Sequence, residues 1–212
     1  MATDLIEIDQ ERPAGEAIAR AAALIRRGGV VAIPTDALYV LAADPYNLAA
    51  VGRVFQAKGR EPNRSLPLLV SDMMMVEDLV IDVTARFTML ARRYWPGPLT
   101  IIESASPRIP LRVTGQTGRL GLRHAKSAVC DALLEELGQP IIATSANISG
   151  SPTGRSGIEV FAMMDGRVDL VLDGGLCAAK GSTTIDITEP YWRVIKEGAI
   201  EEKELAELLK GS

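Results

Sequence analysis

The chain has little of what disulfide frameworks, zinc sites and membrane spans require. Its 212 residues include two cysteines and one histidine. Cys130 and Cys177 lie far apart without C-x-x-C or Cys/His ligand spacing, which argues against a disulfide framework and against a zinc site. No segment approaches the ~20 apolar residues of a membrane span, and residues 1–11 are acidic where a signal peptide would be apolar. We therefore expect a cytoplasmic protein without a membrane partner.

Positive charge and glycine-rich phosphate loops are also scarce. The 23 Lys and Arg residues are outnumbered by 27 Asp and Glu residues, for a formal net charge of −4. Because binding nucleic acid over a whole face requires a basic surface, any tRNA contact should be weak or local. Neither G-x-x-x-x-G-K-[ST] nor G-x-G-x-x-G occurs, so side-chain cations would have to bind any phosphate.

Helical and strand patterns alternate along the chain. An apolar stripe over 17–25 predicts a helix that ends at Gly28 and Gly29, and the run 30–33 predicts a buried strand. The same patterns predict helices near 48–57, 84–94, 127–137 and 201–209, and strands near 66–70, 98–103, 120–123, 141–144, 169–172, 183–188 and 192–196. With 47% hydrophobic residues, the chain can bury one substantial core. We predict a single α/β domain over residues 1–212, built on a mixed sheet flanked by helices.

The segment 149–157 is the part of the chain richest in glycine, serine and proline. Such a composition is typical of a linker. We interpret it as a binding loop, because it follows a buried strand directly and the remaining residues would form only a thin second domain.

A basic pair follows the helix predicted to end near residue 57. Lys58 and Arg60 are placed where a loop can project them inward. Taken alone, such a pair is most often a solvated basic turn.

A run of small polar residues follows the strand 141–144. Ser145 and Asn147 could form an N-cap or an Asx turn without any ligand. Their position favours binding, because residues 34–36 and Arg123 also follow predicted strands, and ligands of open α/β sheets bind at the carboxyl ends of strands.

Seven segments resemble, in order, the motifs of the YrdC family of threonylcarbamoyl-adenylate synthases. They are PTDALYVL at 34–41, KGREPNRSL at 58–66, RYWPGPLT at 93–100, GLR at 121–123, TSANISG at 144–150, GSTTID at 181–186 and IKEGAI at 195–200. The resemblance covers about residues 15–200. It implies a YrdC-like fold, which is a twisted mixed sheet flanked by helices with a concave, positively lined cavity.

The resemblance also implies an activity. In the family, the cavity binds ATP, L-threonine and bicarbonate and releases pyrophosphate and L-threonylcarbamoyl-adenylate. A downstream transferase complex passes the threonylcarbamoyl group to N6 of adenosine 37 in tRNA. This chain would then be an L-threonylcarbamoyladenylate synthase, a nucleotidyltransferase. Its ATP would be accompanied by Mg²⁺, for which the sequence names no protein ligand.

Residue roles follow from the matching positions. The resemblance assigns Lys58 and Arg60 to catalysis and ATP binding, Ser145, Asn147 and Lys196 to ATP binding, and Thr35, Arg123 and Ser182 to threonine binding.

The chain departs from the family pattern beside these positions. Ala37 and Val40 replace a threonine and a glycine, and Glu61 and Ser65 stand where prolines are common. Lys196 replaces an arginine, which keeps the charge and loses the bidentate fork. These substitutions could alter ATP affinity or activity.

Two other functions remain open. The first is a non-catalytic RNA-binding module that uses the same basic concavity. The second is synthesis of carbamoyl-adenylate from carbamoyl phosphate, as in the YrdC-like domain of hydrogenase maturation proteins, where the domain is embedded in a much larger chain. From its length we expect the short family form, without the extra C-terminal domain.

Overall fold

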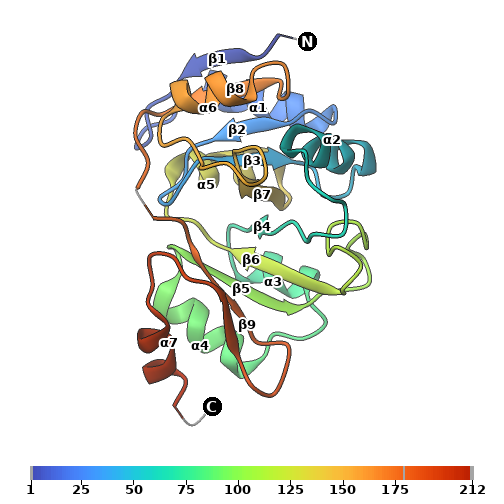
Figure 1. Cartoon of the computed structure of the whole chain (residues 1–212), viewed down its shortest axis with the longest axis vertical. Helices are drawn as coiled ribbons and strands as arrows, with labels where there is room; N and C mark the ends of the chain where they lie inside the picture. Colours follow the sequence, from blue (N-terminus) through green and yellow to red (C-terminus); the bar gives the residue numbers. More distant parts are fainter. Residues whose placement is uncertain (1, 179, 211–212) are drawn as a thin grey trace.

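The structure, a computed structural model, describes residues 2–178 and 180–210. Within these residues, ten strands form one sheet in the order β1-β8-β2-β3-β7-β4-β6-β5-β9-β10 (Figure 1). The strands are β1 (Asp4–Glu7), β2 (Val31–Ile33), β3 (Val40–Ala43), β4 (Leu68–Leu69), β5 (Leu99–Ser104), β6 (Arg119–Arg123), β7 (Ile141–Ser145), β8 (Leu170–Asp173), β9 (Thr183–Asp186) and β10 (Arg193–Lys196). The helices are α1 (Gly15–Arg26), α2 (Leu48–Lys58), α3 (Met73–Leu79), α4 (Ala85–Tyr94), α5 (Ala128–Leu137), α6 (Gly157–Met164) and α7 (Glu202–Leu208).

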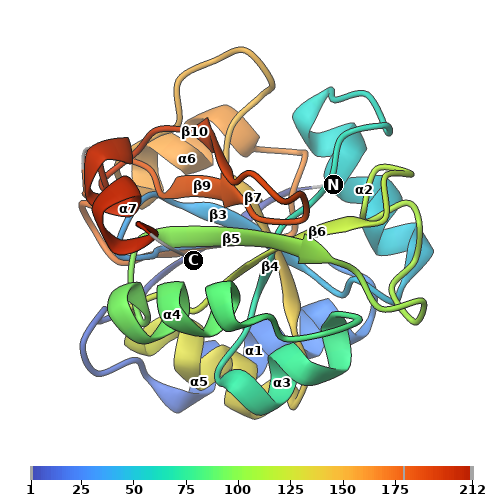
Figure 2. The ribbon, with the colours of Figure 1, turned by 90° about the horizontal axis from the view of Figure 1, so that it is seen from below.

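The two-residue strand β4 joins two larger parts of the sheet. We call β1, β8, β2, β3 and β7 the first half-sheet, and β6, β5, β9 and β10 the second half-sheet. Leu68 of β4 pairs with Ile142 of β7 in the antiparallel sense and with Leu122 of β6 in the parallel sense. The strands β6 and β7 therefore run in opposite directions. Figure 2 shows β9 and β10 on one side of β5, with α3 and α4 on the other side.

Apolar side chains cover both faces of the first half-sheet. Helices α1 and α5 bury Ile18, Ile25 and Leu133 against one face. Helices α2 and α6 bury Val54 and Val160 against the other, in a core that continues under α3 and α4. Because both faces are covered, the first half-sheet is a rigid support for the loops at its ends.

Local signals set the ends of α2. The side chain of Asn47 accepts hydrogen bonds from the backbone N–H groups of Ala49 and Ala50, which caps the helix start. Gly59 has φ of 56° and ends the helix in the left-handed conformation that glycine adopts without strain. This places Lys58 in the last helical position.

The mixed α/β sheet predicted from the sequence is confirmed. The predicted elements are present with shifts of one or two residues at most ends, and β1, β3, α3 and α6 were not predicted. The segment 149–157, interpreted as a loop, ends at the first residue of α6. No helix in the described part of the chain has the length and apolar character needed to cross a membrane.

Candidate active site

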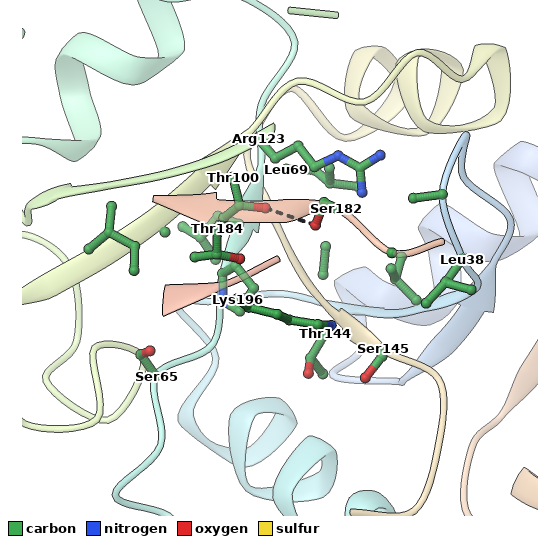
Figure 3. Close-up of a pocket in the computed structure, with 18 of the residues that line it drawn as sticks. Leu38, Ser65, Leu69, Thr100, Arg123, Thr144, Ser145, Ser182, Thr184 and Lys196 are labelled. Atoms are coloured by element: carbon green, nitrogen blue, oxygen red, sulfur yellow. Dashed lines mark hydrogen bonds between the residues drawn. The ribbon is translucent and has the colours of Figure 1, made fainter. Parts of the chain in front are cut away.

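A cavity of about 360 Å³ lies between the two half-sheets (Figure 3). Strands from both halves line it in an alternating pattern: Thr100 and Ile102 of β5 face the cavity, whereas Leu99 and Ile101 pack into the apolar core with α4. The described residues that line it are Ala37, Leu38, Val40, Arg60, Arg64, Ser65, Pro67, Leu68, Leu69, Thr100, Ile102, Gly121, Arg123, Ala143, Thr144, Ser145, Gly181, Ser182, Thr184, Ile195 and Lys196.

The charged residues of the lining are all cations. They are Arg60, Arg64, Arg123 and Lys196, and no carboxylate of the described residues lines the cavity. This contrasts with the net charge of −4 for the whole chain. A cavity whose charged lining residues are all positive, in a protein of net negative charge, favours an anionic ligand.

Lys58 is a fifth cation and lies behind the lining. It is 2% exposed. Its ammonium donates hydrogen bonds to the backbone oxygen of Ser145, to the backbone oxygen of Asn147 at 3.1 Å and to Oδ1 of Asn147 at 3.0 Å. The prediction that Lys58 stands on a loop is wrong, because the helix extends one residue further than predicted and Lys58 is its last residue. The buried ammonium therefore has neutral oxygens, and no carboxylate, as its hydrogen-bond partners.

The environment of Lys58 disfavours its charged form. Burial, together with the smaller effect of the positive charges of Arg60 and Lys196, lowers the pKa of Lys58 to about 7. An anion in the cavity would favour the charged form. Ligand binding and protonation of Lys58 should therefore be coupled.

This coupling gives a measurable pH dependence. Between about pH 7 and the ordinary pKa of lysine, the unfolded chain binds more protons at this position, so the stability of the unliganded protein should rise with pH across that window. At pH 8, binding of inorganic pyrophosphate should take up protons, measured by titration calorimetry in buffers of different ionisation enthalpy. Lys58→Met should remove most of this uptake. An uptake unchanged in Lys58→Met would assign it to another group.

Asn147 holds the end of β7 in place. Its Oδ1 accepts from the Ser145 hydroxyl at 2.6 Å and from Lys58, and its amide donates to the backbone oxygens of Ile148 and Ser151. Asn147 is 8% exposed and does not line the cavity, whereas Ser145 does. Direct binding of ATP by either side chain stays a prediction, and the geometry gives Asn147 a positioning role as well.

Arg123 is buried at the side of the cavity that is opposite Ser145. Its Nε donates to the backbone oxygen of Gly97 at 3.0 Å, and its guanidinium forms an ion pair with Asp36. The hydroxyl of Thr35 is occupied by its own turn, where it donates to the backbone oxygen of Leu38 and accepts from the N–H groups of Ala37 and Leu38. Thr35 therefore supports the turn and does not line the cavity.

Ser182 and Lys196 come from the second half-sheet. The Ser182 hydroxyl lies 3.1 Å from the hydroxyl of Thr100 (Figure 3). Lys196 extends from β10 toward Thr144 of β7 and has no ion-pair partner among the described residues. These side chains are part of the cavity wall that the second half-sheet contributes.

The sequence predicted that residues 34–36, Arg123 and Ser145 follow strands at one carboxyl edge of the sheet. This holds for residues 34–36 and Ser145, because β2 and β7 are both antiparallel to β3, and it is wrong for Arg123. Strand pairing places Arg123 beside Leu69, and Leu69 beside Ile141 at the start of β7. Ser145 is at the other end of β7, beside Val40. Arg123 is at the other edge because β6 is parallel to β4, which is antiparallel to β7, and Arg123 and Ser145 both line the cavity.

Several lining residues were not predicted. Thr100 and Thr184 line the cavity and were given no role from the sequence, and Arg64 and Thr144, which belong to the basic and small polar runs, line it without an assigned role of their own. A polar residue inside an otherwise apolar run, such as threonine at position 100 in LTII, is the signal that could have revealed Thr100. Among the departures from the family pattern, Ala37, Val40, Ser65 and Lys196 line the cavity, and Glu61 does not.

Comparison with known proteins identifies the family. The Sua5/YciO/YrdC family model, described as telomere recombination, matches residues 23–198. The chain belongs to the Sua5/YciO/YrdC family. This confirms the resemblance on which the assignment of Lys58, Arg60, Ser145 and Asn147 to a ligand site was based.

Curated relatives in this family carry the name threonylcarbamoyl-AMP synthase. The *Pyrococcus abyssi* protein is 34% identical over 190 residues, which are 89% of this chain and 56% of that protein. The *Bacillus subtilis* protein is 38% identical over 74% of this chain and 46% of its own length. The chain thus spans about half the length of these two relatives. The *Halorhodospira halophila* protein is 34% identical over 79% of this chain and 88% of its own length.

Solved structures show the same fold. *P. abyssi* Sua5 complexed with L-threonine has a TM-score of 0.93 at 33% identity, covering 98% of this chain and 61% of that one. *Escherichia coli* YciO has a TM-score of 0.88 at 26% identity, covering 96% of this chain and 99% of that one. Full-length HypF, at 18% identity and a TM-score of 0.75, shares the fold alone.

Proposed function

We propose that this family member is an L-threonylcarbamoyladenylate synthase, a nucleotidyltransferase that uses ATP, L-threonine and bicarbonate. The cation-lined cavity backed by the buried ammonium of Lys58 carries the proposal, because a triphosphate supplies the negative charge that these groups lack. The names of the relatives and the L-threonine bound to *P. abyssi* Sua5 support the choice of substrates.

The chemistry requires positioning and charge neutralisation and no covalent nucleophile. The threonine amine forms a bond to the carbon of carbon dioxide, released from bicarbonate with loss of water, and gives up a proton to become a carbamate. A carbamate oxygen then attacks the α-phosphorus of ATP, and the bond to the bridging oxygen of pyrophosphate breaks. Negative charge grows on the departing pyrophosphate, which is where cations contribute most.

The proposed roles follow the walls of the cavity. Lys58 and Arg60 offset the charge of the triphosphate and of the departing pyrophosphate, with Ser145 and Lys196 beside them. Arg123, on the far side, binds the threonine carboxylate, because its ion pair with Asp36 leaves part of the guanidinium on the cavity wall.

Mg²⁺ enters this proposal as part of the ATP substrate. No group of three or more His, Cys, Asp or Glu side chains in the described part of the chain could hold a metal ion. Asp36, which neighbours the cavity, is already paired with Arg123. The residues present therefore do not fit a protein-held metal, and the phosphates of the nucleotide would be the ligands of the ion.

The product is an activated acyl group and needs an acceptor. We propose that a tRNA threonylcarbamoyl-transferase complex receives it and modifies N6 of adenosine 37, and that the protein works in the cytoplasm. Any tRNA contact of this chain would be weak or local, since its net charge is negative and nucleic-acid binding over a whole face requires a basic surface.

Pyrophosphate release with different amino acids tests the proposal. With ATP and bicarbonate, we expect release with threonine, weaker release with serine and the least with valine. A site that hydrogen-bonds a substrate hydroxyl rejects the analogue without it strongly, whereas loss of one methyl group costs about 1–3 kcal/mol. Thr35 and Ser182 were assigned this hydroxyl from the resemblance, and Ser182 is the one of the two that lines the cavity.

The outcomes separate the alternatives. Release that requires threonine supports the synthase. No release with any amino acid, together with RNA binding that falls steeply with salt and ignores threonine, would support the RNA-binding module instead. Release as fast with valine as with serine would remove Ser182 from the threonine site while leaving the synthase reaction in place.

A further inference from the structure

Thr100 is a buried polar residue in an apolar strand. It is 5% exposed, and its neighbours in β5, Leu99 and Ile101, are fully buried. A buried hydroxyl is costly unless it is hydrogen-bonded. The partner of the Thr100 hydroxyl is the hydroxyl of Ser182, at 3.1 Å, and neither hydroxyl has another hydrogen-bond partner in the described part of the chain.

The surroundings fix the orientation of the Thr100 side chain. A Cβ added at Gly121 would lie 3.2 Å from Cγ2 of Thr100, so the methyl group of Thr100 packs against Gly121. Since the branched side chain of threonine has few χ1 options, a methyl group held on one side directs the hydroxyl to the other, toward Ser182. Thr100 itself is held in β5, which pairs with β6 and β9.

Ser182 is less constrained than Thr100. It precedes β9 and ends the segment that crosses from β8 in the first half-sheet to β9 in the second. It is half-buried, whereas Thr100 is buried. The hydrogen bond thus joins a rigid strand residue to a residue at the end of a crossing segment.

We propose that Thr100 is a positioning residue that fixes the Ser182 hydroxyl at the cavity wall for recognition of the hydroxyl of the amino-acid substrate. The inference rests on the proposed function. Two hydroxyls carry two protons, and their mutual bond uses one of them. The pair therefore offers one proton and free lone pairs to the cavity, which match a substrate hydroxyl that donates and accepts and match no part of a valine side chain.

Three variants test this role. Thr100→Val keeps the shape and removes the hydroxyl, and we expect KM for threonine to rise about tenfold. KM for valine, the affinity for ATP and kcat should stay unchanged. The threonine-to-valine ratio of kcat/KM should therefore fall about tenfold. Thr100→Ser should restore most of the ratio. Thr184→Val is the matched control, because Thr184 pairs with Thr100 across β5 and β9 and lines the cavity, and no hydrogen bond joins it to Ser182 in the described part of the chain.

The outcomes are decisive in both directions. A folded Thr100→Val variant with the parent ratio, or an equal fall in Thr184→Val, would overturn the positioning role. If Thr100→Val does not fold, Ser182→Ala removes the same hydrogen bond, and an unchanged ratio in that variant overturns the role.

The proposed function is judged separately, on the parent protein. Pyrophosphate release that depends on threonine, with the parent ratio kept in the variants, refutes the role of Thr100 alone. A parent that neither binds threonine in calorimetry nor releases pyrophosphate refutes both.

Discussion

Replacing Lys58 with alanine is expected to lower ATP-dependent turnover by at least about tenfold, because a charge-assisted phosphate contact contributes roughly 1.5–3 kcal/mol. The same variant should have a lower Tm. Truncation removes a buried side chain and leaves the backbone oxygens of Ser145 and Asn147, and Oδ1 of Asn147, without this donor. Turnover and a thermal melt of the same preparation provide the measurement.

Arg60→Ala is the matched control for this prediction. Arg60 lines the same cavity, and its hydrogen bonds to Thr144 and Ser65 are long, at 3.4 and 3.5 Å. We therefore expect a similar loss of turnover with a Tm within a few degrees of the parent. A Tm that falls only in Lys58→Ala separates the two roles. An unchanged Tm in both variants would contradict the structural role of Lys58.

Replacing Arg123 with alanine is expected to destabilise the protein by about 3–5 kcal/mol and to remove the dependence on threonine. Removing one partner of a buried ion pair leaves the other charge uncompensated, which is the origin of a cost of this size. Asp36 is that partner, and its side chain is 16% exposed. Chemical denaturation measures the stability, and pyrophosphate release with varied threonine measures the second effect.

Two further variants separate charge from geometry at this pair. Arg123→Lys keeps the positive charge but loses the planar guanidinium, which binds the backbone oxygen of Gly97 and the carboxylate of Asp36 at the same time. We therefore expect KM for threonine to rise, and Tm to fall less than in Arg123→Ala. Asp36→Asn keeps a hydrogen-bond acceptor for the guanidinium, so its changes in threonine KM and in Tm should be the smallest of the three variants. A threonine KM equal to that of the parent in a folded Arg123→Ala would remove Arg123 from the substrate site.

The elements predicted from the sequence are those with a clear period and clear ends. Helix α1 has an apolar stripe and a glycine pair after it, and α5 ends at Gly138 in the left-handed conformation. Strand β3 was not predicted, because two of its four residues are alanines, which are depleted in strands, whereas β2 is rich in β-branched residues. Helix α6 was hidden by the glycine-rich residues before it. Both β3 and α6 form because of tertiary packing, which a local sequence pattern does not contain.

The features of the site also divide into those that local motifs predicted and those that depend on long-range contacts. Short motifs indicated Arg60, Ser145, Ser182 and Lys196, and all four line the cavity. The burial of Lys58 could not be read from K-x-R, since it depends on contacts 87 and 89 residues away along the chain. The antiparallel pairing of β4 with β7, which decides how the strand ends are placed, is likewise long-range. The order of the motifs was enough to identify the family, whereas the directions of the strands could be determined only from the structure.

The position of β8 in the sheet has a consequence for synthesis of the chain. β8 lies between β1 and β2 and pairs with both in parallel. On a ribosome, β1 emerges first and waits until residues 170–173 are made, so the first half-sheet closes only near the end of translation. Until then the edges of β1 and β2 that will pair with β8 lack that partner, and unpaired strand edges are sites of aggregation. Nascent chains stalled before residues 170–173 leave the ribosome should therefore need chaperones more than chains stalled after these residues have left it.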